Sequence, residues 1–130
     1  MPSLSSAAKR FLALGGFAAL IAVALGAFGA HGLKAHLSAE QLAIWHTGVE
    51  YQFVHALGLL AIGIVAALLP DSSLLKWSGA LMCAGIVFFS GSLYALALTG
   101  ISPLGAIAPV GGVAFILAWV LFVAAVLRRY

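Results

Sequence analysis

The side chains that could do chemistry lie mainly in one stretch, from Ser38 to Pro70. This stretch opens with polar residues and continues into an apolar run. Among its ionisable or hydrogen-bonding members are Glu40, His46, Glu50, Tyr51, Gln52 and His55. Carboxylates and imidazoles exchange protons and bind metal ions, so a proton or cation relay and a metal site are the chemistries to consider.

The spacing separates these groups into two faces of a helix. His46 and Glu50 are four residues apart and share one face. His55 lies about 140° around the helix from Glu50 and groups with Tyr51 and Gln52. One helix therefore cannot present Glu50 and His55 to the same metal ion, and no HExxH motif is present.

Glu50 is the carboxylate that most needs a partner, because it lies at the edge of an apolar segment where an unpaired charge is costly. The sequence favours a local ion pair with His46, or with Lys34 or His36. A relay is an alternative. A metal site is another, although irregular spacing supports it weakly; its donors would be His31, His36, His46 and Glu50.

The buried imidazole of His55 also needs a partner, and the third apolar run offers hydroxyl groups. Ser90 and Tyr94 lie on a stripe of small residues there, so either could bond His55 or Gln52 and hold the helices together. The full predicted polar cluster is His31, His46, Glu50, Tyr51, Gln52, His55, Ser90 and Tyr94. No nucleophile constellation is visible, so we predict no catalytic residue, no metal ligand set and no cofactor.

Composition indicates that membrane helices position these residues. Of 130 residues, 65% are hydrophobic and 7% are charged, whereas a soluble domain is about one quarter charged. We therefore expect a single all-α domain, an integral membrane four-helix bundle with spans at about 11–33, 50–69, 74–98 and 104–127. The net charge of +3 forms no basic stripe, so nucleic acid is not an expected partner.

Local signals predict where the helices begin. Ser38 and Gln41 have capping-box spacing, so the second helix should start near residue 39, extend beyond the membrane on the outer side, and bend at Gly48. Pro109 predicts a kink or a late helix start.

Charge predicts the orientation, because basic residues gather on the cytoplasmic side. With four crossings, both termini lie on the same side of the membrane. The basic residues on that side are Lys9, Arg10, Lys76, Arg128 and Arg129, whereas Lys34 is the one on the other side. Both termini are thus expected in the cytoplasm.

Glycines predict where helices approach closely or self-associate. The predicted packing positions are Gly26, Gly29, Gly32, Gly79, Gly91 and Gly112. Cys83 has no second cysteine to pair with and is expected to be a small buried apolar residue.

Four motifs, in order, resemble a known family. They are GAFGAHGL at 26–33, WHTGVEYQ at 45–52, FSGSLY at 89–94 and PVGG at 109–112. Together they are similar to the small membrane proteins grouped as domain of unknown function 423, related to the transmembrane protein 256 group. The resemblance implies a four-helix protein of the bacterial cytoplasmic membrane and implies no activity. Its motif positions here are Gly29, His31, Gly32, Trp45, Tyr51, Gln52, His55, Gly91, Tyr94, Pro109 and Gly112.

The leading functional hypothesis is a non-enzymatic accessory, scaffold or lipid-binding protein, with membrane lipids and a second copy or another membrane protein as partners. It rests on the lack of catalytic groups and on how little chain lies outside lipid. One alternative is a small proton- or ion-coupled transporter or channel, with Glu50, His55 and Tyr94 lining the path. Another is a metal-binding protein that uses the outer histidines.

Overall fold

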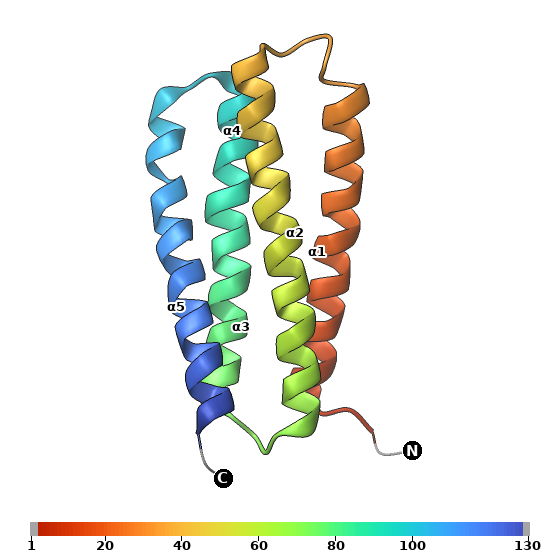
Figure 1. The fold of residues 1–130 in the computed structure, drawn as a ribbon, viewed down its shortest axis with the longest axis vertical. Helices are drawn as coiled ribbons and strands as arrows, with labels where there is room; N and C mark the ends of the chain where they lie inside the picture. Colours follow the sequence, from red (N-terminus) through yellow and green to blue (C-terminus); the bar gives the residue numbers. More distant parts are fainter. Residues whose placement is uncertain (1–2, 129–130) are drawn as a thin grey trace.

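The computed structural model describes residues 3–128 of the chain. Over this range four helical segments are long and apolar enough to cross a membrane: Ser6–His31, Ala39–Leu68, Ser73–Thr99 and Ser102–Leu127. They lie side by side in an up-and-down bundle (Figure 1). The first helix begins at the same end of the bundle at which the last helix ends. The predicted all-α four-helix bundle is confirmed.

The first two helices pack against each other along their length. Helix α1 covers Ser6–His31 and is capped by Ser5, whose hydroxyl accepts the amide of Ala8 at 3.1 Å. Helix α2 covers Ala39–Leu68 and opens with the predicted capping box, in which Ser38 and Gln41 exchange bonds of 3.1 and 2.9 Å.

Helix α2 continues without interruption through Gly48, where the sequence predicted a bend. Gly48 is instead the place where the Tyr94 ring lies against α2, because a Cβ at Gly48 would be 2.7 Å from that ring. The glycine provides room for a neighbouring side chain and leaves the helix hydrogen bonds intact.

The third crossing contains a π-helical turn. Helix α3 covers Ser73–Gly85, the π turn η1 covers Ile86–Ser90, and α4 covers Gly91–Thr99. A π turn widens the helix locally. Here the wider turn is held on two sides: the Ser90 hydroxyl donates to the Gly48 carbonyl at 2.7 Å, and the Phe89 backbone lies directly against Gly111.

The fourth crossing starts late, as one reading of Pro109 predicted. A 3-10 turn, η2, covers Ser102–Ala106, and helix α5 covers Ala108–Leu127 with Pro109 in its first turn. Proline is tolerated there because the first amides of a helix need no internal partner. Gly100 closes α4 with a positive φ of 69°.

The glycines that sit at close approaches are only partly those predicted. Gly29 lies against the Trp45 ring, Gly26 against Val49, and Gly79 against Phe11. Three predicted positions are corrected. Gly91 has no atom within 4 Å of an added Cβ, Gly112 meets only Phe89 at 3.9 Å, and Gly32 lies against Phe28 of α1, the helix that Gly32 caps.

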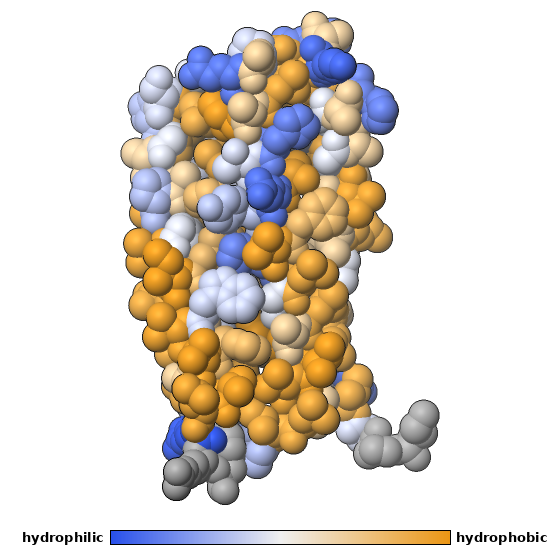
Figure 2. Space-filling view, viewed as in Figure 1, coloured by the Kyte–Doolittle hydropathy of each residue, from blue (hydrophilic) through white to orange (hydrophobic). Residues whose placement is uncertain are grey.

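The charges lie near the two ends of the bundle. One end of the bundle holds both chain termini, and the helix ends that meet there carry Lys9, Arg10, Lys76 and Arg128. The connection at the opposite end carries Lys34. Arg129 lies outside the described residues. Which end faces the cytoplasm stays a prediction. Figure 2 shows the apolar surface between the ends, interrupted by hydrophilic side chains that run down from the upper end.

Candidate functional site

Gln52 joins three helices at the centre of the polar cluster. The Tyr94 hydroxyl on α4 donates to the Gln52 side-chain oxygen at 2.6 Å. The Gln52 amide nitrogen then donates to the backbone carbonyl of Ala18 on α1 at 2.9 Å. Gln52 is buried, so these bonds replace the water that its amide would otherwise bind. The Tyr94–Gln52 pair is among the pairings expected from the sequence.

The His55 ring is held through both of its nitrogens. The Trp119 indole on α5 donates to Nε2 at 3.1 Å, and Nδ1 lies 2.7 Å from the Tyr51 carbonyl. Because an indole only donates, Nε2 must accept and Nδ1 must carry the hydrogen. The Phe115 ring stacks on the imidazole with centroids 3.4 Å apart. His55 is therefore a neutral, fully bonded side chain with no free nitrogen for a metal.

The expected partner of His55 was wrong. The sequence pointed to Ser90 or Tyr94 in the third crossing, but the donor is Trp119 in the fourth. Ser90 instead donates to the Gly48 carbonyl. The missed signal was available, because a tryptophan within an apolar helix carries an N–H that must find an acceptor.

The polar interior is completely paired. Across residues 3–128, every buried side-chain nitrogen and oxygen has a hydrogen-bond partner. Trp45 donates to the Leu25 carbonyl at 2.9 Å, and Ser78 to the Ala118 carbonyl at 2.6 Å. The donors and acceptors of the cluster therefore pair with one another and join the helices.

Three members of the predicted cluster face outward and stay apart from this interior: His31, His46 and Glu50. Tyr51 is also exposed, but its ring stacks on His55 with centroids 6.0 Å apart and lies 4.5 Å from the Phe89 ring. In the described part of the chain the expected ion pair of Glu50 with His46, Lys34 or His36 does not form; the ion pair found is Lys76 with Asp71. The proposed metal donors are not brought together either, since no three His, Cys, Asp or Glu residues cluster between residues 3 and 128.

A groove lies beside the buried cluster and opens to the outer surface of the bundle. Its volume is about 250 Å³, and Gln52 and Leu59 of α2 form its floor. One wall comes from α1 with Leu14, Phe17, Ala18 and Ile21; the other comes from the third crossing with Cys83, Ile86 and Val87. Apart from the amide of Gln52, which is already bonded, the lining offers no polar side chain. Its chemistry suits a hydrocarbon chain.

Each of the two wall helices carries a cation on its groove face, beyond the groove and toward the end of the bundle where the chain termini lie. On α1, Arg10, Leu14 and Phe17 follow at spacings of four and three, which puts them on one face. On α3, Lys76 and Cys83 are seven residues apart and share a face in the same way. Arg10 and Lys76 are both exposed.

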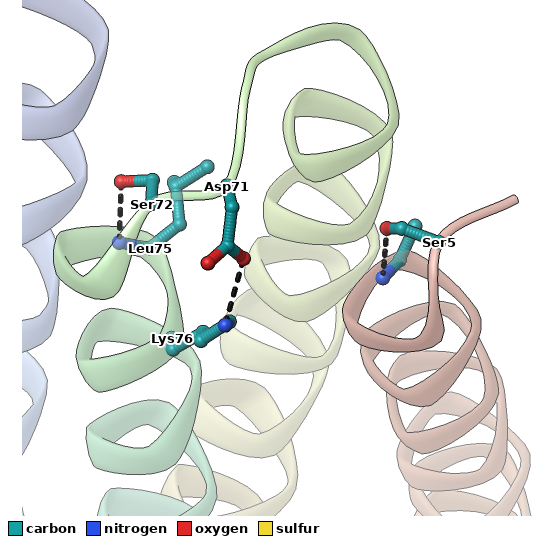
Figure 3. Close-up of polar contacts among 6 residues, drawn as sticks. Ser5, Asp71, Ser72, Leu75 and Lys76 are labelled. Atoms are coloured by element: carbon teal, nitrogen blue, oxygen red, sulfur yellow. Dashed lines mark hydrogen bonds and ion pairs between the residues drawn. The ribbon is translucent and has the colours of Figure 1, made fainter.

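A carboxylate already pairs with one of the two cations, Arg10 and Lys76, that form the cationic end of the bundle. Asp71 Oδ1 lies 2.7 Å from Lys76 Nζ, and Figure 3 shows the two side chains pointing toward each other beside the start of α3. Ser72 caps the same helix by accepting the Leu75 amide at 3.3 Å. Both partners of the ion pair are well exposed, so Lys76 remains accessible to another anion.

Comparison with known proteins agrees with the sequence motifs. The sequence profile of the family described as protein of unknown function (DUF423) matches residues 25–112. The UPF0382 membrane protein YwdK of Bacillus subtilis is 52% identical over 120 residues, covering 92% of this chain and 98% of the relative. The UPF0382 membrane protein SSP2132 of Staphylococcus saprophyticus is 53% identical over 115 residues, covering 88% and 94%. No solved structure matches.

The chain belongs to the DUF423 family.

The predicted family resemblance is thereby confirmed, and this DUF423 protein is a multi-pass bacterial membrane protein. The names of its relatives describe membrane proteins and state no activity. The matched region runs from the end of α1 to the first turns of α5. It contains Gln52, Tyr94 and the groove residues of the third crossing, but Trp119 lies beyond it.

Proposed function

We propose that this DUF423 protein is a non-enzymatic membrane protein that binds an anionic phospholipid, with an acyl chain in the groove between α1 and the third crossing. The observation that carries the proposal is the groove itself: an apolar groove of about 250 Å³, with Arg10 and Lys76 further along the same faces of its two wall helices. A phospholipid is the molecule with matching parts, a hydrocarbon chain joined to a phosphate.

The distances along the helix suit such a ligand. Arg10 and Phe17 are seven residues apart, which is about 10 Å at 1.5 Å per residue. A phosphate near Arg10 and Lys76 would place the first acyl carbons beside Leu14 and the following ones beside Phe17. Basic residues near a membrane surface attract anionic lipids with about 1 kcal/mol each.

The remaining hypotheses have less support. A transporter that used His55 and Tyr94 would need a path past groups that are fully bonded and packed against Phe115 and Gln52. A metal-binding protein would need donors that the fold keeps apart.

Native mass spectrometry of protein purified with phosphatidylglycerol or phosphatidylcholine tests the proposal. We expect phosphatidylglycerol to stay bound preferentially and Ile21→Trp, which fills the groove, to lose it. Leu20→Trp is the matched control, because Leu20 is the neighbouring residue and is exposed away from the groove lining. Equal retention of both lipids, or equal loss in both tryptophan variants, would refute the proposal.

The cationic end is tested separately. Replacing Arg10 and Lys76 together by glutamine should reduce phosphatidylglycerol retention by roughly tenfold or more. Lys34→Gln removes one charge at the opposite end and should leave retention unchanged. If Lys34→Gln lowers retention as much as the double variant does, the effect is one of net charge and the site is wrong.

A further inference from the structure

The face of α2 that points away from the bundle has the spacing of a helix–helix seam. Beginning at Ala43, residues alternate four and three apart: Thr47, Glu50, Val54, Leu57, Ala61 and Ile64. All are exposed except Ala61, which is partly exposed. A 3.5-residue repeat keeps one line of side chains facing a partner helix. The seam lies opposite the residues that pack inside the bundle, such as Gln52 and Leu59.

Glu50 makes this face unusual, because it stands at a depth where the other helices are apolar. Gly26 of α1 meets Val49, so Glu50 lies about level with Val23, which is 59% exposed. The Tyr51 ring lies 6.3 Å from Phe115, so Glu50 also lies about level with Val113, which is 56% exposed.

The apolar surface also continues outward past this level. Ser90 bonds the Gly48 carbonyl, and Leu98, eight residues further along α4, is still 52% exposed. Eight helical residues correspond to about 12 Å. In the described chain Glu50 has no ion pair and no side-chain hydrogen bond, and a carboxylate facing lipid at this depth carries a large penalty.

We propose that the α2 seam is the interface with a second copy of this chain, in which Glu50 gains its missing partners. Two copies in one membrane meet as parallel helices about a two-fold axis, so every contact occurs twice. With Glu50 and Leu57 facing their own equivalents, the hole that receives Glu50 is formed by Thr47, Glu50, Tyr51 and Val54 of the second copy. The hydrogen-bond donors in this hole have to offset the repulsion between the two Glu50 carboxylates.

Complementary hydrogen bonding favours a second copy as the occupant. The Glu50 carboxylate needs donors, and Tyr51 brings a hydroxyl that makes no hydrogen bond in the described part of the chain while its side chain is 42% exposed. Two-fold symmetry supplies that donor to each Glu50. Ala43 and Ala61 are small enough to let the two backbones approach. This interface lies on a different face from the proposed lipid groove.

Cysteine crosslinking in native membranes tests the interface. In a Cys83→Ala background, Leu57→Cys should form a disulfide-linked dimer of this chain with an added oxidant. Val120→Cys is the matched control, because Val120 is about as exposed, and its neighbour Trp119 contacts Gly58 of α2 at the same depth. Crosslinking at Val120 that equals crosslinking at Leu57, no dimer at Leu57, or capture of a different protein would each overturn the proposal.

A second measurement covers the role of Glu50. Glu50→Ala and Tyr51→Phe should each weaken dimerisation in vesicles by roughly five- to twentyfold, because each variant removes two symmetry-related hydrogen bonds between membrane helices. Both are surface changes, so circular dichroism should show the helices intact. Dimerisation that is unchanged in both variants overturns the assignment of Glu50 to the interface.

Discussion

Trp119 donates its indole N–H to Nε2 of His55 at 3.1 Å, and this bond fixes the tautomer of a buried imidazole. The donor comes from α5 and the acceptor from α2, so one hydrogen bond joins the last helix to the second. The Phe115 ring stacks on the same imidazole. His55 is therefore a structural junction between helices.

Trp119→Phe should destabilise the protein by about 1–3 kcal/mol, because it leaves the buried Nε2 of His55 without a donor. Trp77→Phe is the matched control, since the Trp77 side chain is 65% exposed. Chemical denaturation in detergent micelles, followed by circular dichroism, measures both. Equal stability of the two variants would show that the His55–Trp119 bond contributes nothing.

The pair of Tyr94 and Gln52 predicts a characteristic non-additive result. Tyr94→Phe alone should cost about 1 kcal/mol by removing the donor to a buried amide oxygen. Once Gln52→Leu has removed that oxygen, the same change should cost much less. A double-mutant cycle on the free energy of unfolding measures the difference. Additive costs would mean that the Tyr94–Gln52 bond contributes nothing to stability.

Two glycines should respond in opposite ways to the same substitution. Gly111→Ala pushes a methyl group into the Phe89 backbone at the π turn, so we expect a loss of stability or a shift of that turn. Gly91→Ala meets open space within a helix, so it should stabilise by about 0.5–1 kcal/mol. Thermal unfolding of both variants provides the comparison, and a stability loss at Gly91 would contradict the observed packing.

Much of the architecture could be predicted because it follows from composition and local chemistry. An apolar chain with few charges must span lipid, Ser38 and Gln41 fix one helix start, and Pro109 fixes another. The π turn could not be predicted, because it arises from contacts with Gly48 and Gly111 on other helices.

The candidate site was predicted in part for the same reason. Gln52, His55 and Tyr94 were recognisable as polar residues in apolar helices, which require partners. The choice of partner depends on how helices are rotated about their axes, and periodicity within one helix does not determine it. His55 accordingly bonds Trp119, and Glu50 faces outward without the expected His46 pair.

The ion pair at the cationic end provides a gain-of-function prediction. Asp71→Asn removes the carboxylate that lies 2.7 Å from Lys76, so the ammonium becomes available to a lipid phosphate. Retention of phosphatidylglycerol in native mass spectra should rise severalfold, by an amount in line with about 1 kcal/mol for one charge. Glu40→Gln, at the opposite end, is the matched control and should change nothing. A fall in retention for Asp71→Asn would contradict the role assigned to Lys76.

Photo-crosslinking with phosphatidylglycerol that carries a diazirine on its acyl chain tests lipid binding most directly. If the groove holds the chain, labelling will concentrate on Leu14, Phe17 and Ile21 of α1 and on Cys83 and Val87 of the third crossing. Labelling spread equally over exposed apolar positions such as Val113 and Val120 of α5 would contradict a bound lipid.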